Sequence, residues 1–189
     1  MKLPAVLALV IALAACSRQV ASLQVLGTVP QFELIAQDGQ PFDSRALAGK
    51  IWVADFIYTT CPGPCPRMTS QMREVQDAVS KIPALSSNVR LVSFTVDPAQ
   101  DTPPVLASYA KSHGASAAMW SFLTGPVPVL QMLDRDAFKL GNIDASMQHS
   151  TRFALVDGQG RIRGYYDTSE PSAIPKVISD IHALARERG

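Results

Sequence analysis

The sequence predicts a single α/β domain with a largely parallel central sheet. Residues 51–58 and 89–96 are rich in β-formers and almost continuously apolar, as strands buried on both faces are. A helical pattern follows each of these strands, and a β-hairpin with a closing helix ends the chain. With 189 residues and 47% hydrophobic content, the chain can bury one substantial core. These observations together favour the α/β class.

Each expected element rests on a local pattern. Residues 31–35 alternate between apolar and polar side chains, and Asp38-Gly39 provides a turn into a short return strand at 41–42. Met68 and Met72 occur at helical spacing on an apolar face. The later elements are a helix at 66–81, a strand at 89–96, a helix from 103 to about 113, a strand at 119–123, a helix at 127–138, strands at 151–156 and 161–166, and a helix at 171–188.

The order of these elements predicts the topology. A strand, a cysteine-containing loop and a helix lead to a second parallel strand, and a terminal hairpin packs with the last helix. Right-handed crossovers between such strands give the thioredoxin arrangement. We therefore expect a thioredoxin-like α/β fold with an N-terminal hairpin and an inserted strand and helix.

The first residues have the pattern of a secretory signal. Lys2 precedes an apolar stretch at 4–12, and small residues then lead to Cys16. The stretch is short for a membrane-spanning helix, which needs about 20 residues. It resembles a bacterial lipobox, so we expect a lipoprotein signal peptide at 1–15, a lipidated Cys16, a tether at 16–29 and a domain at 30–189. The alternatives are an ordinary signal peptide with an incidental cysteine, or an uncleaved anchor.

Charge and location narrow the class of partner. The net charge is +1, and neither a basic run nor an acidic tail is present. This pattern argues against a nucleic-acid partner and leaves small ligands, metals or proteins. The signal predicts a bacterial cell-envelope protein, lipid-anchored and facing the periplasm or the outside.

Cys61 and Cys65 are separated by Pro-Gly-Pro and followed by Pro66. A disulfide across three residues closes a very short loop and contributes little stability, so the pair is expected to be functional. Pro66 fits the first helical position, which places Cys65 at the N-cap. Both sulfurs would then lie near the positive end of a helix dipole, which favours thiolates and lowers the thiol pKa. A metal site and a redox-active pair both remain compatible with this loop.

The predicted sheet brings His149 to the cysteines. The strand at 151–156 should pair antiparallel with the strand at 51–58, so its first residues lie beside the cysteine loop. Two thiolates and one imidazole suit copper, with thiolate softness favouring Cu(I). Zinc is the alternative, although three ligands and an open position differ from a closed structural zinc site. Without the topology, His149 would be an ordinary loop histidine.

At this point the chain resembles the Sco/SenC family. The resemblance rests on Cys61-x3-Cys65-Pro66, on Val96-Asp97-Pro98-x2-Asp101-Thr102-Pro103, and on His149 before a strand ending at Asp157-Gly158. It implies a thioredoxin-like fold and copper, as Cu(I) and also Cu(II), bound by Cys61, Cys65 and His149. It also implies a role in assembling the dinuclear copper centre of cytochrome c oxidase, and a dithiol able to reduce a partner.

Two features depart from the family pattern. Gln148 stands where an aspartate often precedes the histidine. A lipid on Cys16 is expected in place of the family's frequent transmembrane helix. Asp97 is expected at the end of the strand next to the cysteine strand, where it could orient His149 or tune the copper. The alternative is that Asp97 and Asp101 only shape a turn and cap a helix.

The sequence thus supports a membrane-anchored copper chaperone. Its partners would be the copper-bearing subunit of cytochrome c oxidase or another cuproprotein, a thiol reductant, and the membrane through the lipid. The alternative is a thiol-disulfide reductase or redox sensor in which Cys61 and Cys65 cycle and metal is incidental. A thiol peroxidase ranks third, because no proline upstream of Thr59 or Thr60 completes a Pro-x3-Thr-x2-Cys pattern.

Overall fold

The computed structural model describes residues 22–141 and 150–187. Its strands are β1 (Gly27–Thr28), β2 (Glu33–Ala36), β3 (Pro41–Asp43), β4 (Ile51–Ile57), β5 (Val89–Thr95), β6 (Trp120–Thr124), β7 (Arg152–Val156) and β8 (Arg161–Asp167). Its helices are the 3-10 turn η1 (Ser44–Leu47), α1 (Cys65–Ser80), α2 (Pro83–Ser86), α3 (Pro103–Ser112), α4 (Val127–Gln131) with its π-helical continuation η2 (Met132–Ala137), and α5 (Ala173–Glu187).

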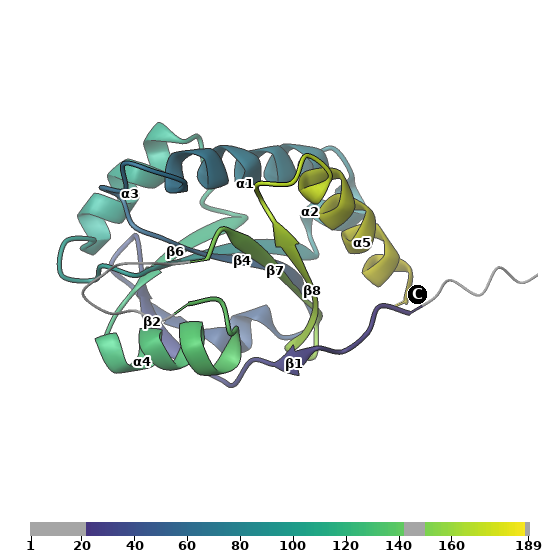
Figure 1. Cartoon of the computed structure of the whole chain (residues 1–189), viewed down its shortest axis with the longest axis horizontal. Helices are drawn as coiled ribbons and strands as arrows, with labels where there is room; N and C mark the ends of the chain where they lie inside the picture. The colour runs from purple at the N-terminus through teal and green to yellow at the C-terminus, as the bar shows by residue number, and fades with distance from the viewer. Residues whose placement is uncertain (1–21, 142–149, 188–189) are drawn as a thin grey trace, which may run out of the picture.

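The strands form one mixed sheet in the order β1-β8-β7-β4-β5-β6-β2-β3. Strand β4 pairs parallel with β5 and antiparallel with β7, and β5 pairs parallel with β6. Helices α1, α2, α3 and α5 lie on one face of the sheet and α4 lies on the other (Figure 1). The predicted α/β architecture, with its N-terminal hairpin and the added β6 and α4, is confirmed.

Strand β4 is the centre of the core, and each of its seven residues is buried. Ile51, Val53 and Ile57 pack with the apolar side chains of α1, α3 and α5. Trp52 and Phe56 point to the opposite face, where they pack with residues of α4 and η2. This alternation on a strand buried on both faces explains the nearly continuous apolar run in the sequence.

The pairing brings three chain segments to one edge of the sheet. The carboxyl ends of the parallel strands β4 and β5 lie there together. Strand β7 runs the other way, with Ala154 opposite Ala54 and Val156 opposite Trp52. Continued in this register, Ser150 would lie level with Tyr58, just before the cysteine loop. The predicted neighbourhood of the β7 start and the cysteine loop therefore follows from the observed sheet.

The domain begins earlier than the predicted tether boundary at residue 29. Gly27 and Thr28 pair with β8, and the Arg163 guanidinium donates to the Leu23 carbonyl at 2.6 Å. A two-residue strand has no periodic signature of its own, and its partner lies more than a hundred positions away in the chain. Within the two described ranges, no helix is long and apolar enough to cross a membrane.

Candidate metal centre

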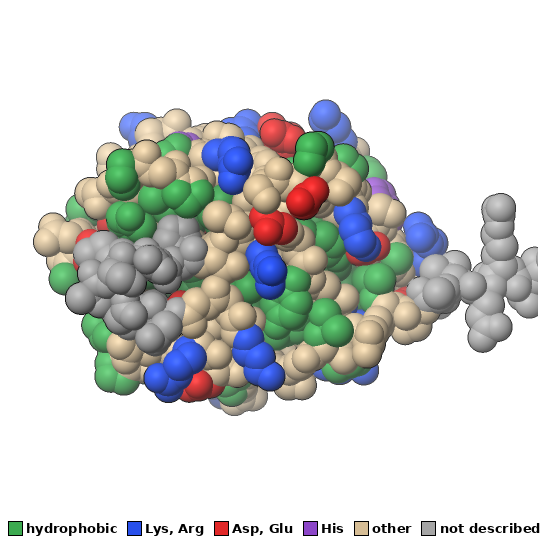
Figure 2. Space-filling view, viewed as in Figure 1, with side chains coloured by type: hydrophobic (Ala, Val, Ile, Leu, Met, Phe, Trp, Pro, Cys, Tyr) green, Lys and Arg blue, Asp and Glu red, His purple; other side chains and the backbone are tan. Residues whose placement is uncertain are grey.

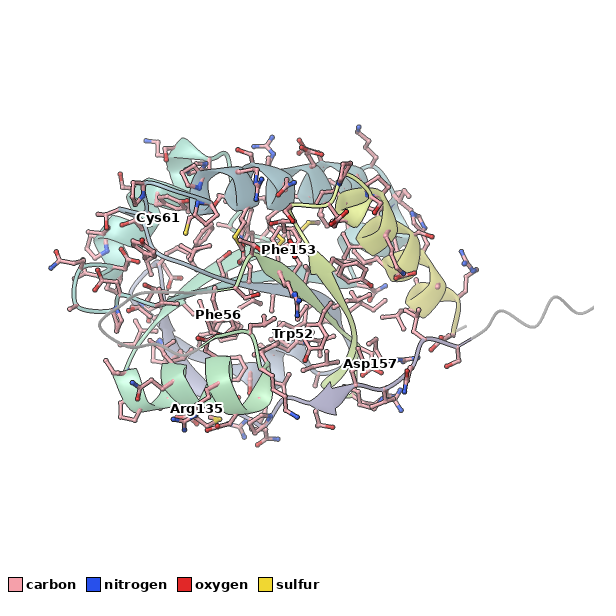
Figure 3. The ribbon with its side chains drawn as sticks, in the orientation of Figure 1. Trp52, Phe56, Cys61, Arg135, Phe153 and Asp157 are labelled. Carbon is pink, nitrogen blue, oxygen red and sulfur yellow. The ribbon has the colours of Figure 1, made fainter. Side chains whose placement is uncertain are left out.

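The cysteine loop leaves the carboxyl end of β4 and enters α1. Cys61 is 7% exposed and Cys65 is completely buried, and both are free thiols. The Cys61 amide donates to the Tyr58 carbonyl at 3.3 Å, which closes a turn at the strand end. Figure 3 shows Cys61 at this end of the molecule. The prolines restrict φ on either side of Cys65, so the loop is stiff where the two thiols meet.

Helix α1 begins one residue earlier than predicted. Cys65 is the first helical residue, Pro64 is the N-cap, and Pro66 lies in the first turn. The steric preference of a residue before proline disfavours helical geometry without excluding it. The prediction of Cys65 at the N-cap was therefore wrong by one position, while the thiol still lies at the positive end of the helix.

The two thiols differ in acidity. Burial raises the pKa of Cys61, but hydrogen bonds from the Cys65 backbone and thiol, the Gly63 amide and the Tyr58 side chain outweigh it and lower that pKa overall. Burial dominates at Cys65 and raises its pKa strongly. The predicted lowering of the thiol pKa is confirmed for Cys61 and wrong for Cys65. At Cys65, burial destabilises the thiolate more than the nearby hydrogen-bond donors stabilise it.

The predicted third ligand and the lipid site lie outside the described residues. His149 directly precedes Ser150, the first described residue before β7, and Cys16 precedes Ser22. Among the described residues, no group of three histidine, cysteine, aspartate or glutamate side chains could hold a metal ion. The described part of the chain thus supplies the two soft sulfur donors of the predicted copper site.

The Asp101 side chain makes more hydrogen bonds between the ends of β4 and β5 than Asp97 does. Asp101 is completely buried, and its Oδ1 accepts from the Thr59 hydroxyl at 2.5 Å while Oδ2 accepts from the Thr95 hydroxyl at 2.5 Å. Asp97 is buried, and its backbone amide donates to Thr95 Oγ1 at 2.9 Å. Its expected role near the copper stays a prediction. Asp101, expected only to shape a turn or cap a helix, does not cap α3, whose N-cap is Thr102; its carboxylate instead contacts the segment that leads to Cys61.

A second buried carboxylate, Asp55, lies in β4 on the face that also packs against α1. Its Oδ1 accepts from Ser93 Oγ at 2.6 Å, and Ser93 Oγ accepts from the Trp120 indole at 2.9 Å. Burial raises the pKa of Asp55 to about 7, partly offset by the Ser93 hydroxyl. The sequence offered one signal for this residue, a single charge inside an otherwise apolar strand.

Fold and paired thiols define a thioredoxin-like dithiol protein. The model of the SCO1/SenC family matches residues 21–186, and the chain belongs to that family. The SCO1 protein homolog of Bacillus subtilis is 31% identical over 182 residues, which cover 92% of this chain and 91% of the relative.

Solved structures agree with the fold prediction. A SCO1/SenC family lipoprotein from Bacillus anthracis is 30% identical, with a TM-score of 0.79 over 87% of this chain and 99% of that one. BsSco, described as a cytochrome c oxidase assembly protein with a disulfide switch, is 30% identical, with a TM-score of 0.76 over 86% and 96% of the two chains. Copper-bound ScoI from Bradyrhizobium japonicum, at 22% identity, shares the fold with a TM-score of 0.67 over 83% and 99%.

Proposed function

We propose that the protein is a lipid-anchored copper chaperone that delivers copper to the dinuclear centre of cytochrome c oxidase. The observation that carries this proposal is the pair of free thiols on a stiff loop beside the start of β7. Cys61 and Cys65 supply soft donors suited to Cu(I), and His149 would complete the set from the residue before Ser150. The family and the copper-bound relative support this assignment.

The two thiols would lose their protons at different stages of copper binding. Cys61, with its lowered pKa, would bind first as a thiolate, whereas Cys65 must lose its proton as its sulfur binds. The nearly buried sulfurs would exclude water from the metal while Cys61 retains a route to the surface. A partner's thiolate could then enter at Cys61 and take over the metal by ligand exchange.

The surface around Cys61 fits a protein partner. Pro62 and Gly63 are exposed, and Val105 in the first turn of α3 is 39% exposed at the same edge of the sheet. Figure 2 shows hydrophobic side chains gathered over α3 at this end. An apolar rim around a transfer site suits docking against another protein. We infer that this rim receives the copper-bearing oxidase subunit.

Titration of the reduced protein with Cu(I), against a competing chelator, tests the copper site. We expect one Cu(I) per chain, with affinity lowered more than about tenfold by Cys61→Ser, Cys65→Ser or His149→Ala. His182→Ala in α5 is the matched control and should leave affinity unchanged. Absence of a stable complex, or a complex indifferent to His149→Ala, would contradict the proposal.

Thiol-disulfide exchange is the second candidate, and the unequal acidity of the two thiols favours it. A thiolate at Cys61 is suited to attack a partner disulfide, and Cys65 is suited to resolve the mixed disulfide. In this function His149→Ala should leave the rate of partner reduction unchanged. Oxidase activity of a deletion strain separates the two functions, because added copper should restore activity if delivery is the role and should fail to do so if reduction is.

A further inference from the structure

Three segments at the thiol end of the sheet meet on one buried carboxylate. Asp101 accepts hydrogen bonds from the Thr59 amide at 3.2 Å and the Thr59 hydroxyl at 2.5 Å, two residues before Cys61. It accepts another from the Thr95 hydroxyl at the end of β5. Its own amide donates to the Asp97 carbonyl at 2.9 Å, and α3 begins two residues later. The carboxylate thus ties the exit of β4 to β5 and α3.

We propose that Asp101 is a positioning residue for the dithiol, holding Cys61 at the distance from Cys65 that lets both sulfurs act together. This inference deepens the proposed function and rests on it where copper is concerned. Cys65 is fixed by α1, of which it is the first residue. Cys61 is held by the segment that Asp101 binds, by the turn closed on Tyr58, and by hydrogen bonds from the Gly63 and Cys65 amides.

The strength of this connection follows from its burial. Asp101 and Thr95 have no exposed surface, so water cannot reach the carboxylate side of these bonds, whereas Thr59 is half-buried. A hydrogen bond that a carboxylate accepts is shorter and stronger than one between neutral groups. Without the Thr59 bond, the β4 exit gains freedom and the effective concentration of one thiol at the other falls. Both disulfide closure and two-sulfur metal binding depend on that concentration.

The decisive variant is Thr59→Val, which keeps the shape of the side chain and removes one donor to Asp101. We expect the equilibrium constant for Cys61–Cys65 disulfide formation against glutathione to fall about tenfold, which raises the reduction potential by about 30 mV. Cu(I) affinity should fall by a similar factor, about tenfold. Asp101→Asn should act in the same direction if it folds. Measurements are made on the full chain at a temperature where circular dichroism shows each variant to be folded.

The matched control is Ile181→Val, a buried substitution in α5 that costs stability and leaves every hydrogen bond of Asp101 in place. A merely structural role for Asp101 predicts that Thr59→Val and Ile181→Val both leave the reduction potential unchanged, and that outcome would overturn the proposal. The potential requires no copper, so it tests the positioning role even if the chain binds no metal. Lost Cu(I) binding with an unchanged potential would also overturn it, because both depend on the same spacing.

Discussion

At the scale of single residues, burial separates the roles of the two cysteines. Cys61 keeps a small exposed surface and receives hydrogen bonds that lower its pKa, whereas Cys65 lies inside and its pKa is raised. Since the thiolate is the reactive form, attack should begin at Cys61. The same asymmetry sets the order in which the two sulfurs would lose protons to a soft metal.

Alkylation measures this asymmetry directly. At pH 7, iodoacetamide should modify Cys61 at least about tenfold faster than Cys65, because more of Cys61 is thiolate and its sulfur is accessible. Mass spectrometry of digested peptides separates both residues from Cys16. The single variants Cys65→Ser and Cys61→Ser provide each thiol alone. Equal rates for the two thiols would contradict the difference in acidity.

Asp55 should make stability depend on pH. Its pKa is about 7 when folded and its ordinary value is 3.8, so between these values the folded protein keeps a proton that the unfolded chain has lost. The free energy of unfolding should therefore fall as pH rises through this window, by at most about 1.4 kcal/mol per pH unit, and level off above it.

The substitution Asp55→Asn removes the titrating group while keeping an acceptor for Ser93. Urea unfolding of the reduced, metal-free protein should show the variant gaining stability relative to the parent as pH rises from below 5 to above 7. A difference between variant and parent that is constant across this range would show that Asp55 keeps its ordinary pKa.

At the scale of elements, the end of η2 carries a strained backbone. Lys139 follows the C-cap Phe138 with φ of 53°, and it is the one non-glycine residue with positive φ in the described ranges. Glycine adopts this left-handed conformation without the Cβ clash that costs other residues about 1–2 kcal/mol.

Lys139→Gly should therefore raise the free energy of unfolding by about 1 kcal/mol, after the greater freedom of glycine in the unfolded chain is subtracted. Lys111→Gly, near the end of α3, is the control with the same chemical change. It should lower the free energy of unfolding by about 1 kcal/mol, because glycine is a poor helix former. Urea denaturation of both variants checks the opposite signs.

The sequence predicted those helices, strands and turns that have a clear local pattern in their own residues. The apolar runs of β4 and β5, the spacing of Met68 and Met72, and the Asp38-Gly39 turn all reappear in the structure. Strand β1 and the short helices η1 and α2 were not predicted. Each has two to four residues, too few for a period, and β1 exists only because β8 pairs with it.

The candidate site likewise has features that could be predicted from local sequence and features that depend on long-range contacts. The Cys61–Cys65 spacing is local, and its position at the end of a central strand could be predicted. The contact between Asp101 and Thr59 spans 42 positions, and the raised pKa of Cys65 depends on packing from several elements. Neither feature produces a recognisable pattern in the neighbouring sequence, so both could be identified only from the folded structure.

At the scale of the whole molecule, the thiols and the N-terminal segment lie at opposite ends of β4. Cys61 follows the carboxyl end, whereas Val29 and Leu26 bond to Gly160 and Ile162 beside the β7–β8 turn. Figure 3 shows Cys61 and Asp157 far apart along the sheet. With the proposed lipid on Cys16, we would expect the thiols to face away from the membrane, toward an incoming partner.

The N-terminal segment is held at that end through two arginines that share one carboxylate. Arg163 and Arg161 both bind Asp157 Oδ2, at 2.8 and 2.7 Å, but the Arg163 side chain is 3% exposed and the Arg161 side chain is 41% exposed. Arg163 alone of the two also reaches the Leu23 carbonyl and Glu187. We therefore expect Arg163 to hold the segment and Arg161 to contribute little.

Replacing each arginine by methionine, which keeps much of the apolar stem, tests this division. Arg163→Met should lower the free energy of unfolding by about 3 kcal/mol, because Asp157 loses a buried partner, whereas Arg161→Met should cost less than about 1 kcal/mol. Hydrogen exchange at the Leu26 and Val29 amides should accelerate in Arg163→Met beyond the change in global stability, and stay near the parent rate in Arg161→Met. Equal losses in the two variants, or unchanged exchange at both amides, would mean that β8 pairing holds the segment without the arginine.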